Sequence, residues 1–311
     1  MTTKAIKSKP IRIDTFLNLL CLFVTFIMLF FSSEVKSGVI YGIKLSINTI
    51  IPTLFPFFIL SDFWASYLTL PKESVIRKFF YNCFRIKGDA LTAFLCGTIC
   101  GFPLGAKSAV DLYESKQIDK NELELLCAIS SNPSCAFVIS GIGASMYNNA
   151  FVGILLYFSV ILSACITGTI FKIKNTNISN SKENTRQSFS LVYSIKKAGM
   201  SSITVSSYII FFSALISLWC SVCENTSINL MCASLAEVSS ACSMIKDNLL
   251  LVTPISMSLT AFSLGFSGFS VHMQVFSFLP NCVSKAKYLI IKMMIGIFSA
   301  VTAFCLFSVI K

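Results

Sequence analysis

The segment LTAFLCGTICGFPLGAK, residues 91–107, is an apolar run that breaks at Gly101 and Pro103 and ends on Lys107. Glycine permits backbone conformations that other residues avoid, and proline lacks the N–H that a helix interior needs. Such a break frees backbone polar groups that lipid cannot satisfy, so at membrane depth it requires protein or a wet cavity around it. A solute anion at this break would meet free N–H groups and the Lys107 ammonium. The alternative is a glycine-rich helix end whose lysine reaches the membrane interface. The candidate binding residues here are Gly101, Pro103, Gly105 and Lys107.

The composition of the whole chain indicates that lipid is its main solvent. Of 311 residues, 55% are hydrophobic and 13% are charged, and the mean hydropathy is +0.76. A soluble domain carries about 25% charged residues, so soluble enzymes, disordered tails and disulfide-stapled secreted modules are excluded. The chain also lacks phosphate-loop, dinucleotide and zinc-protease motifs and has a single histidine. We therefore expect no enzymatic activity, no metal site and no cofactor beyond a coupling proton or cation.

Apolar stretches follow one another along the chain, and a spanning helix needs about 20 residues. The 38–70 stretch is too long for one untilted helix and contains Pro52 and Pro56. Other stretches are interrupted at Asn132-Pro133-Ser134 and at Gly265 and Gly268. The stretches are 13–33, 38–70, 90–106, 125–147, 150–171, 201–222, 228–245, 248–279 and 286–310.

Lysine and arginine concentrate before residue 13 and in two loops, 71–89 and 172–197. The positive-inside rule places all three regions on the cytoplasmic side. Three apolar stretches separate the two loops, and three full crossings would put the loops on opposite sides of the membrane. At least one stretch must therefore be re-entrant or half-length. Orientation explains the basic loops, so we expect the lipid bilayer as a partner and no nucleic acid.

Two regions of the chain echo each other in the same order. The tetrapeptide LTAF occurs at 91–94 and at 259–262, and each copy leads into a Gly-Phe pair. Upstream, residues 60–66 match residues 235–241, and the two offsets are 168 and 175 residues. Repeated halves with broken helices point to the binding site of a secondary transporter. We therefore expect an all-α, polytopic, transporter-like membrane protein with a duplicated unit, broken helices and at least one re-entrant or half-length stretch. The expected organisation is a basic segment with the first transmembrane helix at 1–37, a first gate-like repeat with an extra helix at 38–171, a basic cytoplasmic linker at 172–200 and a second repeat at 201–311.

Two carboxylates, Asp62 and Glu237, occupy equivalent places in this repeat. A carboxylate near the bilayer centre costs about 2.5 kcal/mol or more, so it indicates function. It can accept hydrogen bonds from a solute, bind a coupling cation or carry a proton. The alternative is a helix end at which the carboxylate reaches the interface. The breaks add further candidate binding residues, which are Asn132, Ser134, Ser267, Ser270, His272 and Gln274.

Five segments resemble the YlbJ or SpoVV family of sporulation integral membrane proteins. The resemblance covers about residues 38 to 310 and implies a nucleoside recognition or gate domain related to concentrative nucleoside transporters. It implies inverted repeats with two re-entrant hairpins, of which the second would contain Glu237, and it implies a homo-oligomer by analogy. The chain departs from the family pattern at Asp62, Phe102 and Met273, where glutamate, tyrosine and alanine are usual. The segments are IPTLFPFF at 51–58, GFPLGAK at 101–107, NPS at 132–134, LAEV at 235–238 and GFSVHMQ at 268–274.

The resemblance also implies a function in sporulation. Family members are linked to moving dipicolinate across the outer forespore membrane, so a multi-pass protein of that bacterial cell membrane, derived from the mother cell, is expected. Dipicolinate is a planar dianion at neutral pH, which suits Lys107 and helix N-termini but not two carboxylates, unless these hold a proton or a cation. Two alternatives stay open. One is a nucleoside transporter whose carboxylates bind ribose hydroxyls, and the other is a non-transporting component of a sporulation complex.

Overall fold

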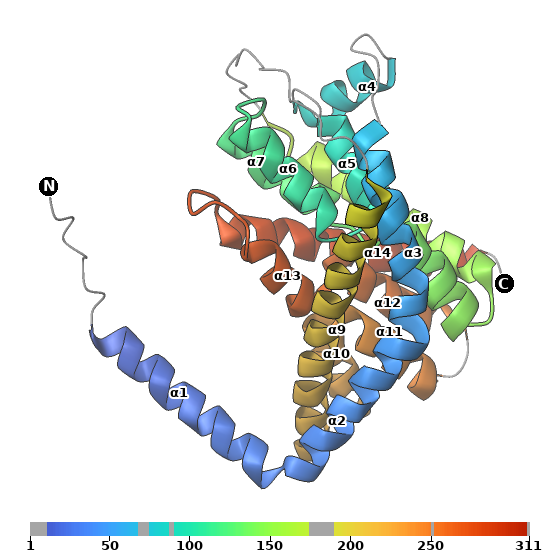
Figure 1. The fold of residues 1–311 in the computed structure, drawn as a ribbon. Coiled ribbons are helices and arrows are strands. Elements are labelled where there is room, and N and C mark those ends of the chain that lie inside the picture. Colours follow the sequence, from blue (N-terminus) through green and yellow to red (C-terminus); the bar gives the residue numbers. More distant parts are fainter. Residues whose placement is uncertain (1–10, 68–74, 87–89, 174–189, 250–251, 310–311) are drawn as a thin grey trace, which may run out of the picture.

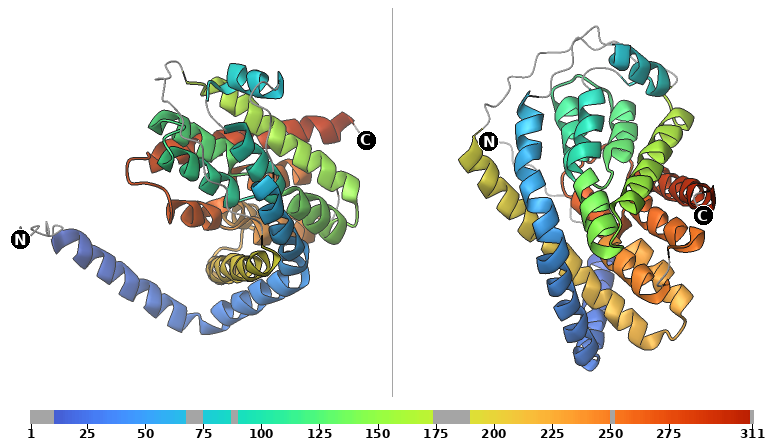
Figure 2. Two further views of the ribbon diagram at one scale, coloured as in Figure 1. Left: turned by 45° about the horizontal axis from the view of Figure 1, so that its top comes forward. Right: turned by 90° about the vertical axis from the view of Figure 1, so that its right-hand side faces the viewer.

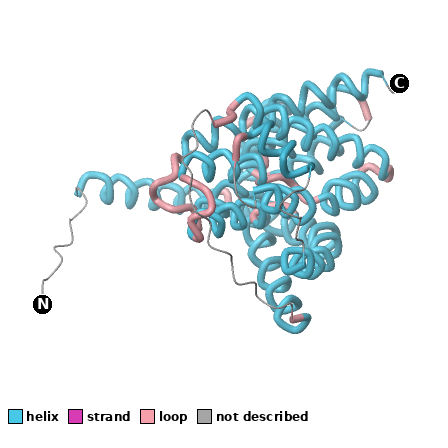
Figure 3. Tube along the Cα trace, turned by 90° about the horizontal axis from the view of Figure 1, so that it is seen from above, coloured by secondary structure: helices cyan, strands magenta, loops and turns pink. Residues whose placement is uncertain are grey.

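The computed structural model describes residues 11–67, 75–86, 90–173, 190–249 and 252–309, and within them every regular element is a helix (Figures 1 and 3). This confirms the all-α expectation. The helices are α1 (Ile11–Phe30), α2 (Ser32–Leu45), the π turn η1 (Ser46–Ile50), α3 (Ile51–Tyr67), α4 (Val75–Phe84), α5 (Ala90–Cys100), α6 (Leu104–Glu114), α7 (Lys120–Ser130), the π helix η2 (Phe137–Met146), α8 (Ala150–Ile170), α9 (Leu191–Val222), α10 (Thr226–Ala236), α11 (Val238–Leu249), α12 (Pro254–Phe266), α13 (Gly268–Phe276) and α14 (Lys285–Val309).

Among the described residues, four helical stretches are long and apolar enough to cross a membrane. Large apolar side chains, such as Phe158, Phe211 and Ile297, remain exposed along them. Lipid accommodates such a surface and water does not, so the chain is an integral membrane protein. The segment expected to hold the first transmembrane helix forms the helix α1, which is not one of these four stretches and points away from the bundle (Figures 1 and 2). The four stretches are Ser32–Leu60, Ala150–Ile170, Leu191–Val222 and Lys285–Val309.

Residues 38–67, the described part of the 38–70 stretch, form one continuous helical path from α2 through η1 into α3, despite Pro52 and Pro56. The amide of Ile51 donates to the Ser46 carbonyl, five residues back, so the helix widens just before Pro52. A π turn absorbs the extra residue without ending the helix. One long helix therefore stands where the prolines indicated an interruption.

Small residues allow α9 to pack closely along this helix (Figure 2). A Cβ added at Gly38 would lie 2.6 Å from the Ser213 carbonyl oxygen, and one at Gly42 would lie 2.8 Å from the Ile210 Cα. Later residues of α2 thus meet earlier residues of α9, so the two helices are antiparallel. Glycine at such a seam lets transmembrane backbones approach. The helix α9 begins inside the linker expected at 172–200.

Four units of helix, break and helix occur in the described part of the chain: α5–α6, α7–η2, α10–α11 and α12–α13. Their breaks meet in pairs. A Cβ added at Gly101 would lie 2.6 Å from the Ser134 nitrogen, which joins the first two breaks. A Cβ added at Gly268 would lie 3.2 Å from the Glu237 Cα, which joins the last two. Interruptions that lie about 30 residues apart in each half of the sequence are therefore neighbours in space.

The first unit is a short helical hairpin. A Cβ added at Gly105 in α6 would lie 2.5 Å from the Gly97 Cα in α5, so the two helices run side by side after the turn at Gly101–Pro103. Each helix has 11 residues, which corresponds to a length of about 16 Å. That is about half of the 30 Å hydrocarbon core of a bilayer.

Glu124 fastens α7 to the start of α14. One carboxylate oxygen accepts from the Ser284 amide at 3.0 Å, and the other accepts from Lys287 Nζ at 2.9 Å. We expect Glu124→Ala to lower the free energy of unfolding by about 1–3 kcal/mol, because the buried bonding partner of both groups is lost. Thermal unfolding in detergent measures this. Lys287→Ala is the control, since its side chain is 41% exposed and should cost at most about 1 kcal/mol. Equal losses in the two variants would contradict the buried tether.

Candidate solute-binding site

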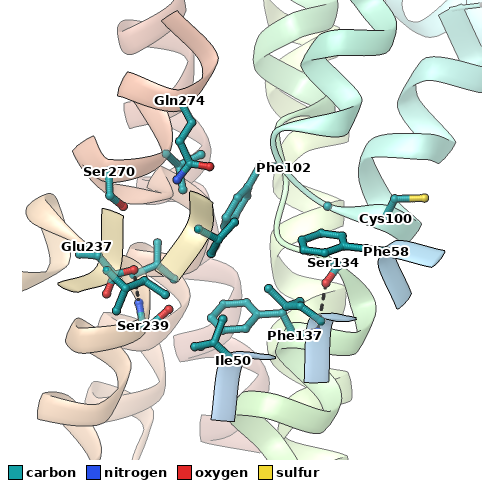
Figure 4. Close-up of a pocket in the computed structure, with 16 residues that line it drawn as sticks. Ile50, Phe58, Cys100, Phe102, Ser134, Phe137, Glu237, Ser239, Ser270 and Gln274 are labelled. Atoms are coloured by element: carbon teal, nitrogen blue, oxygen red, sulfur yellow. Dashed lines mark hydrogen bonds between the residues drawn. The ribbon is translucent and has the colours of Figure 1, made fainter. Parts of the chain in front are cut away.

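A pocket lies where the two pairs of breaks face each other (Figure 4). Its polar lining comes from both halves of the chain. Gly101 and Ser134 belong to the first pair of breaks, and the other polar groups belong to the second pair and α13. We call this cavity the break pocket. Its polar lining is Gly101, Ser134, Glu237, Ser239, Ser270 and Gln274.

Glu237 is the one residue between α10 and α11, and its backbone is extended there, with φ −152°. Its carboxylate is buried and turns back onto α11, where it accepts from the amides of Ser239 at 2.9 Å and Ser240 at 2.6 Å. The first N–H groups of a helix lack partners within the helix and favour an anion. Glu237 therefore uses the anion-binding end of α11 itself. The side chains of Ser239 and Ser240 also hydrogen-bond to this carboxylate, which lines the break pocket.

Ser134, Ser270 and Gln274 complete the polar groups of the break pocket. The Ser134 hydroxyl accepts from the Phe137 amide at 3.1 Å and thereby caps the segment that leads into η2. Its O–H remains as a donor. Ser270 and Gln274 lie one turn apart on α13 and present a hydroxyl and an amide to the cavity (Figure 4).

Aromatic rings form the opposite wall. Phe58 comes from α3, Phe137 from η2, and Phe102 from the α5–α6 turn, from which it points toward Gln274 (Figure 4). Among the described residues that line the break pocket, none is lysine, arginine or histidine. A buried carboxylate, one amide and hydroxyls facing aromatic rings suit a small planar solute that carries hydrogen-bond donors.

The structure brings together five of the residues that the sequence singled out, and it places others elsewhere. Those that line the break pocket are Gly101, Ser134, Glu237, Ser270 and Gln274. Lys107 is exposed on α6 and does not line it. Pro103 precedes α6, and Gly105 packs beneath the Ser130 carbonyl. Asp62 falls within α3, but its side chain lies outside the described residues.

Three more of the expected residues make contacts within or beside the breaks and do not face the pocket. The Asn132 amide donates to the Ile129 carbonyl at 2.6 Å. Ser267 has a left-handed backbone with φ 76°, and its hydroxyl donates to the Leu264 carbonyl. His272 is fully buried, with its ring 4.7 Å from that of Phe266 between centroids. These contacts are structural, and none of the three residues lines the break pocket.

Lys292 is a residue that the sequence reasoning missed. It lies in α14, is fully buried, and donates from Nζ to the Ser131 carbonyl at 2.6 Å. The signal was present, because Lys292 is a charge inside the apolar 286–310 stretch. The argument that singled out Glu237 applies equally to this lysine.

The comparisons with known proteins find a partial similarity to a sporulation integral membrane protein. No protein-family model matches the chain, and no solved structure matches it. Over 116 residues, 37% of its length, the chain is 28% identical to the sporulation integral membrane protein YlbJ of Bacillus subtilis (strain 168). The match spans 28% of that relative's own length. The chain is thus an integral membrane protein with partial similarity to a sporulation protein.

Proposed function

We propose that this chain is a membrane carrier that binds a small polar solute in the break pocket. The observation that carries the proposal is the Glu237 carboxylate, buried at the junction of two half-helices and open to the cavity. Carboxylates at membrane depth are costly and mark solute or ion pathways. Broken helices that meet around one site are the construction used by secondary transporters. The proposal involves no catalysis and no cofactor besides a coupling proton or cation.

The half-length α5–α6 hairpin supports this architecture. A re-entrant hairpin there would leave an even number of crossings between the basic loops at 71–89 and 172–197, so that both loops lie on the cytoplasmic side. In this arrangement the 38–171 and 201–311 repeats each supply one pair of breaks. Rocking of one pair against the other would expose the break pocket to each side of the membrane in turn.

The lining of the break pocket ranks the candidate solutes. A nucleoside offers a planar base to the aromatic wall and ribose hydroxyls to Glu237, and needs no cation. Dipicolinate, which the family resemblance implies, also offers a flat ring. Its two carboxylates would face Glu237 without a basic residue among the described lining residues. Dipicolinate therefore requires a proton on Glu237 or a cation that travels with it, whereas a nucleoside does not.

Uptake into proteoliposomes tests the proposal. Labelled uridine and labelled dipicolinate are supplied separately, with and without an imposed proton gradient, to vesicles containing the wild-type protein or empty vesicles. Saturable uptake of either solute supports the carrier. Uridine uptake without a gradient, together with dipicolinate uptake only with one, is the pattern that the break pocket favours. Uptake of neither under any gradient contradicts transport of these solutes and favours a non-transporting component of a sporulation complex.

Lys107→Ala tests whether the solute binds in the break pocket or at the N-terminus of α6, near Lys107. Because Lys107 is exposed and lies outside the break pocket, we expect the variant to keep uptake within about twofold of wild type, as a distant surface change does. The same uptake assay measures it, with protein content matched between vesicles. Loss of dipicolinate uptake in Lys107→Ala would instead place the anion at the N-terminus of α6.

A further inference from the structure

A second group of polar side chains is buried where α7 ends and α14 passes it. All five are fully buried, and none lines the break pocket. They come from the α7–η2 break, from α13 and from α14. We call them the α7-end cluster. Its members are Ser131, Asn132, His272, Tyr288 and Lys292.

The ammonium of Lys292 occupies the carbonyl end of α7. Its Nζ donates to the Ser131 carbonyl at 2.6 Å, and the Asn132 amide donates to the Ile129 carbonyl at 2.6 Å. The C-terminus of a helix carries partial negative charge and favours a cation. In broken-helix carriers, free carbonyls of this kind are the oxygen ligands of a coupling cation. In this protein the side chain of Lys292 contacts such a carbonyl, that of Ser131.

The described surroundings offer Lys292 no carboxylate. Its one hydrogen bond goes to the Ser131 carbonyl, and no described acidic residue forms an ion pair with it. The titratable groups that face this region are His272 from α13, Tyr288 from α14 and Cys127 from α7. A buried charge requires compensation. The helix end and its carbonyls are the negative groups present to supply it.

Several polar atoms around this ammonium also have no hydrogen-bond partner. These atoms belong to the α7-end cluster and are fully enclosed, so the site is polar beyond the one contact of Lys292. They are Asn132 Oδ1 and both ring nitrogens of His272, whereas the hydroxyl of Tyr288 has the Ser131 side chain as its hydrogen-bonding neighbour. Oxygen acceptors such as Asn132 Oδ1 and the Ser131 carbonyl are the ligand type that hard cations take.

We propose that the Lys292 ammonium is a tethered replacement for a bound monovalent cation at the end of α7. The site then takes no free sodium or potassium in the wild-type protein, and removal of the side chain opens it to them. The meaning for coupling rests on the proposed carrier function, since a fixed cation would make solute movement independent of alkali cations at this place. Cation binding itself can be measured without transport, so the two proposals fail separately.

The test compares thermal unfolding of purified protein in detergent in sodium, potassium, choline or propylammonium chloride at equal ionic strength. Wild type should unfold at the same temperature in all four salts. Lys292→Ala should unfold earlier in choline. Sodium or propylammonium should raise its Tm saturably by about 3 °C or more, because a ligand that binds only the folded state stabilises it. Propylammonium restores the atoms that the substitution removes. Lys287→Ala, a change at an exposed lysine of the same helix, should unfold at one temperature in all four salts, as wild type does, whatever its small loss of stability.

Two results would overturn the proposal. One is a saturable, sodium-specific rise in the Tm of the wild-type protein, because the site would then bind a free cation beside the lysine. The other is a Lys292→Ala variant that folds and responds to none of the cations. If that variant folds in no salt, Lys292→Met, whose side chain fills much of the same space, should be insensitive to all four salts. A sodium response in the Met variant would place the cation elsewhere and refute the replacement. Failure of uptake in proteoliposomes would leave these outcomes unchanged.

Discussion

Gly97→Ala should remove most of the folded protein, although it adds a single methyl group. A Cβ at Gly97 would overlap the carbonyl oxygen of Ser130, a backbone atom at the end of α7. That backbone is held on its far side, where Asn132 binds the Ile129 carbonyl and Lys292 binds the Ser131 carbonyl. Overpacking against side chains costs about 1–3 kcal/mol. Backbone that cannot move should cost more, out of a total stability of about 5–15 kcal/mol.

Gly199→Ala is the matched control for this prediction. Gly199 lies within α9, and a Cβ added there meets nothing within 4 Å. The same substitution should therefore leave folding intact, or stabilise the helix by about 0.5–1 kcal/mol. Size-exclusion chromatography of detergent extracts measures the folded fraction, as the amount of monodisperse protein divided by the total amount expressed. Similar monodisperse yields from the two variants would refute the close contact between α5 and α7.

Glu237→Ala should lower the rate of saturable uptake by at least about 100-fold, which is the effect of losing a central polar contact in a buried site. The substitution removes the acceptor that faces the solute. It also leaves the Ser239 and Ser240 amides without their bonds, at a cost of about 1–3 kcal/mol in unfolding free energy. Uptake and Tm are measured on the same preparation, so that loss of transport is separated from loss of fold.

Glu237→Gln distinguishes a solute ligand from a proton carrier. The amide keeps the size of the side chain and one acceptor oxygen, but it cannot take up or release a proton. If Glu237 couples transport to protons, uptake by this variant should no longer respond to an imposed pH gradient. Glu224→Gln, the same change at an exposed residue between α9 and α10, should keep the wild-type response. A Glu237→Gln protein with an unaltered pH dependence would exclude the coupling role.

Local chemistry explains which parts of the fold were predictable. Gly101 and Pro103 cannot continue a helix, and Asn132-Pro133-Ser134 supplies its own cap, so both breaks can be read from the sequence. The membrane class follows from composition in the same way. Each of these inferences depends on a residue and its chain neighbours.

Long-range contacts explain what the sequence did not reveal. The π turn before Pro52 and the exposure of Lys107 outside the break pocket depend on hydrogen bonds and packing, which a local sequence pattern does not contain. The LTAF echo in the sequence relates α5 to α12, whereas the order of the breaks along the chain relates the α5–α6 unit to the α10–α11 unit.

Apolar composition predicts the lipid-embedded part of a helix but not its full length. For this reason the sequence did not predict that α9 begins at Leu191, ahead of Lys196 and Lys197.

Because Glu237 caps α11, the charge preference of the site depends on this one residue, whereas the helical scaffold depends on many. The helix needs some acceptor for the Ser239 and Ser240 amides, and Glu237 supplies it from a position outside both helices. A lineage that exchanged this residue for a small neutral one would uncover two N–H groups at the cavity, at the cost in stability expected for Glu237→Ala. Natural variation at one codon can thus reverse the charge preference of the site while the scaffold is inherited unchanged.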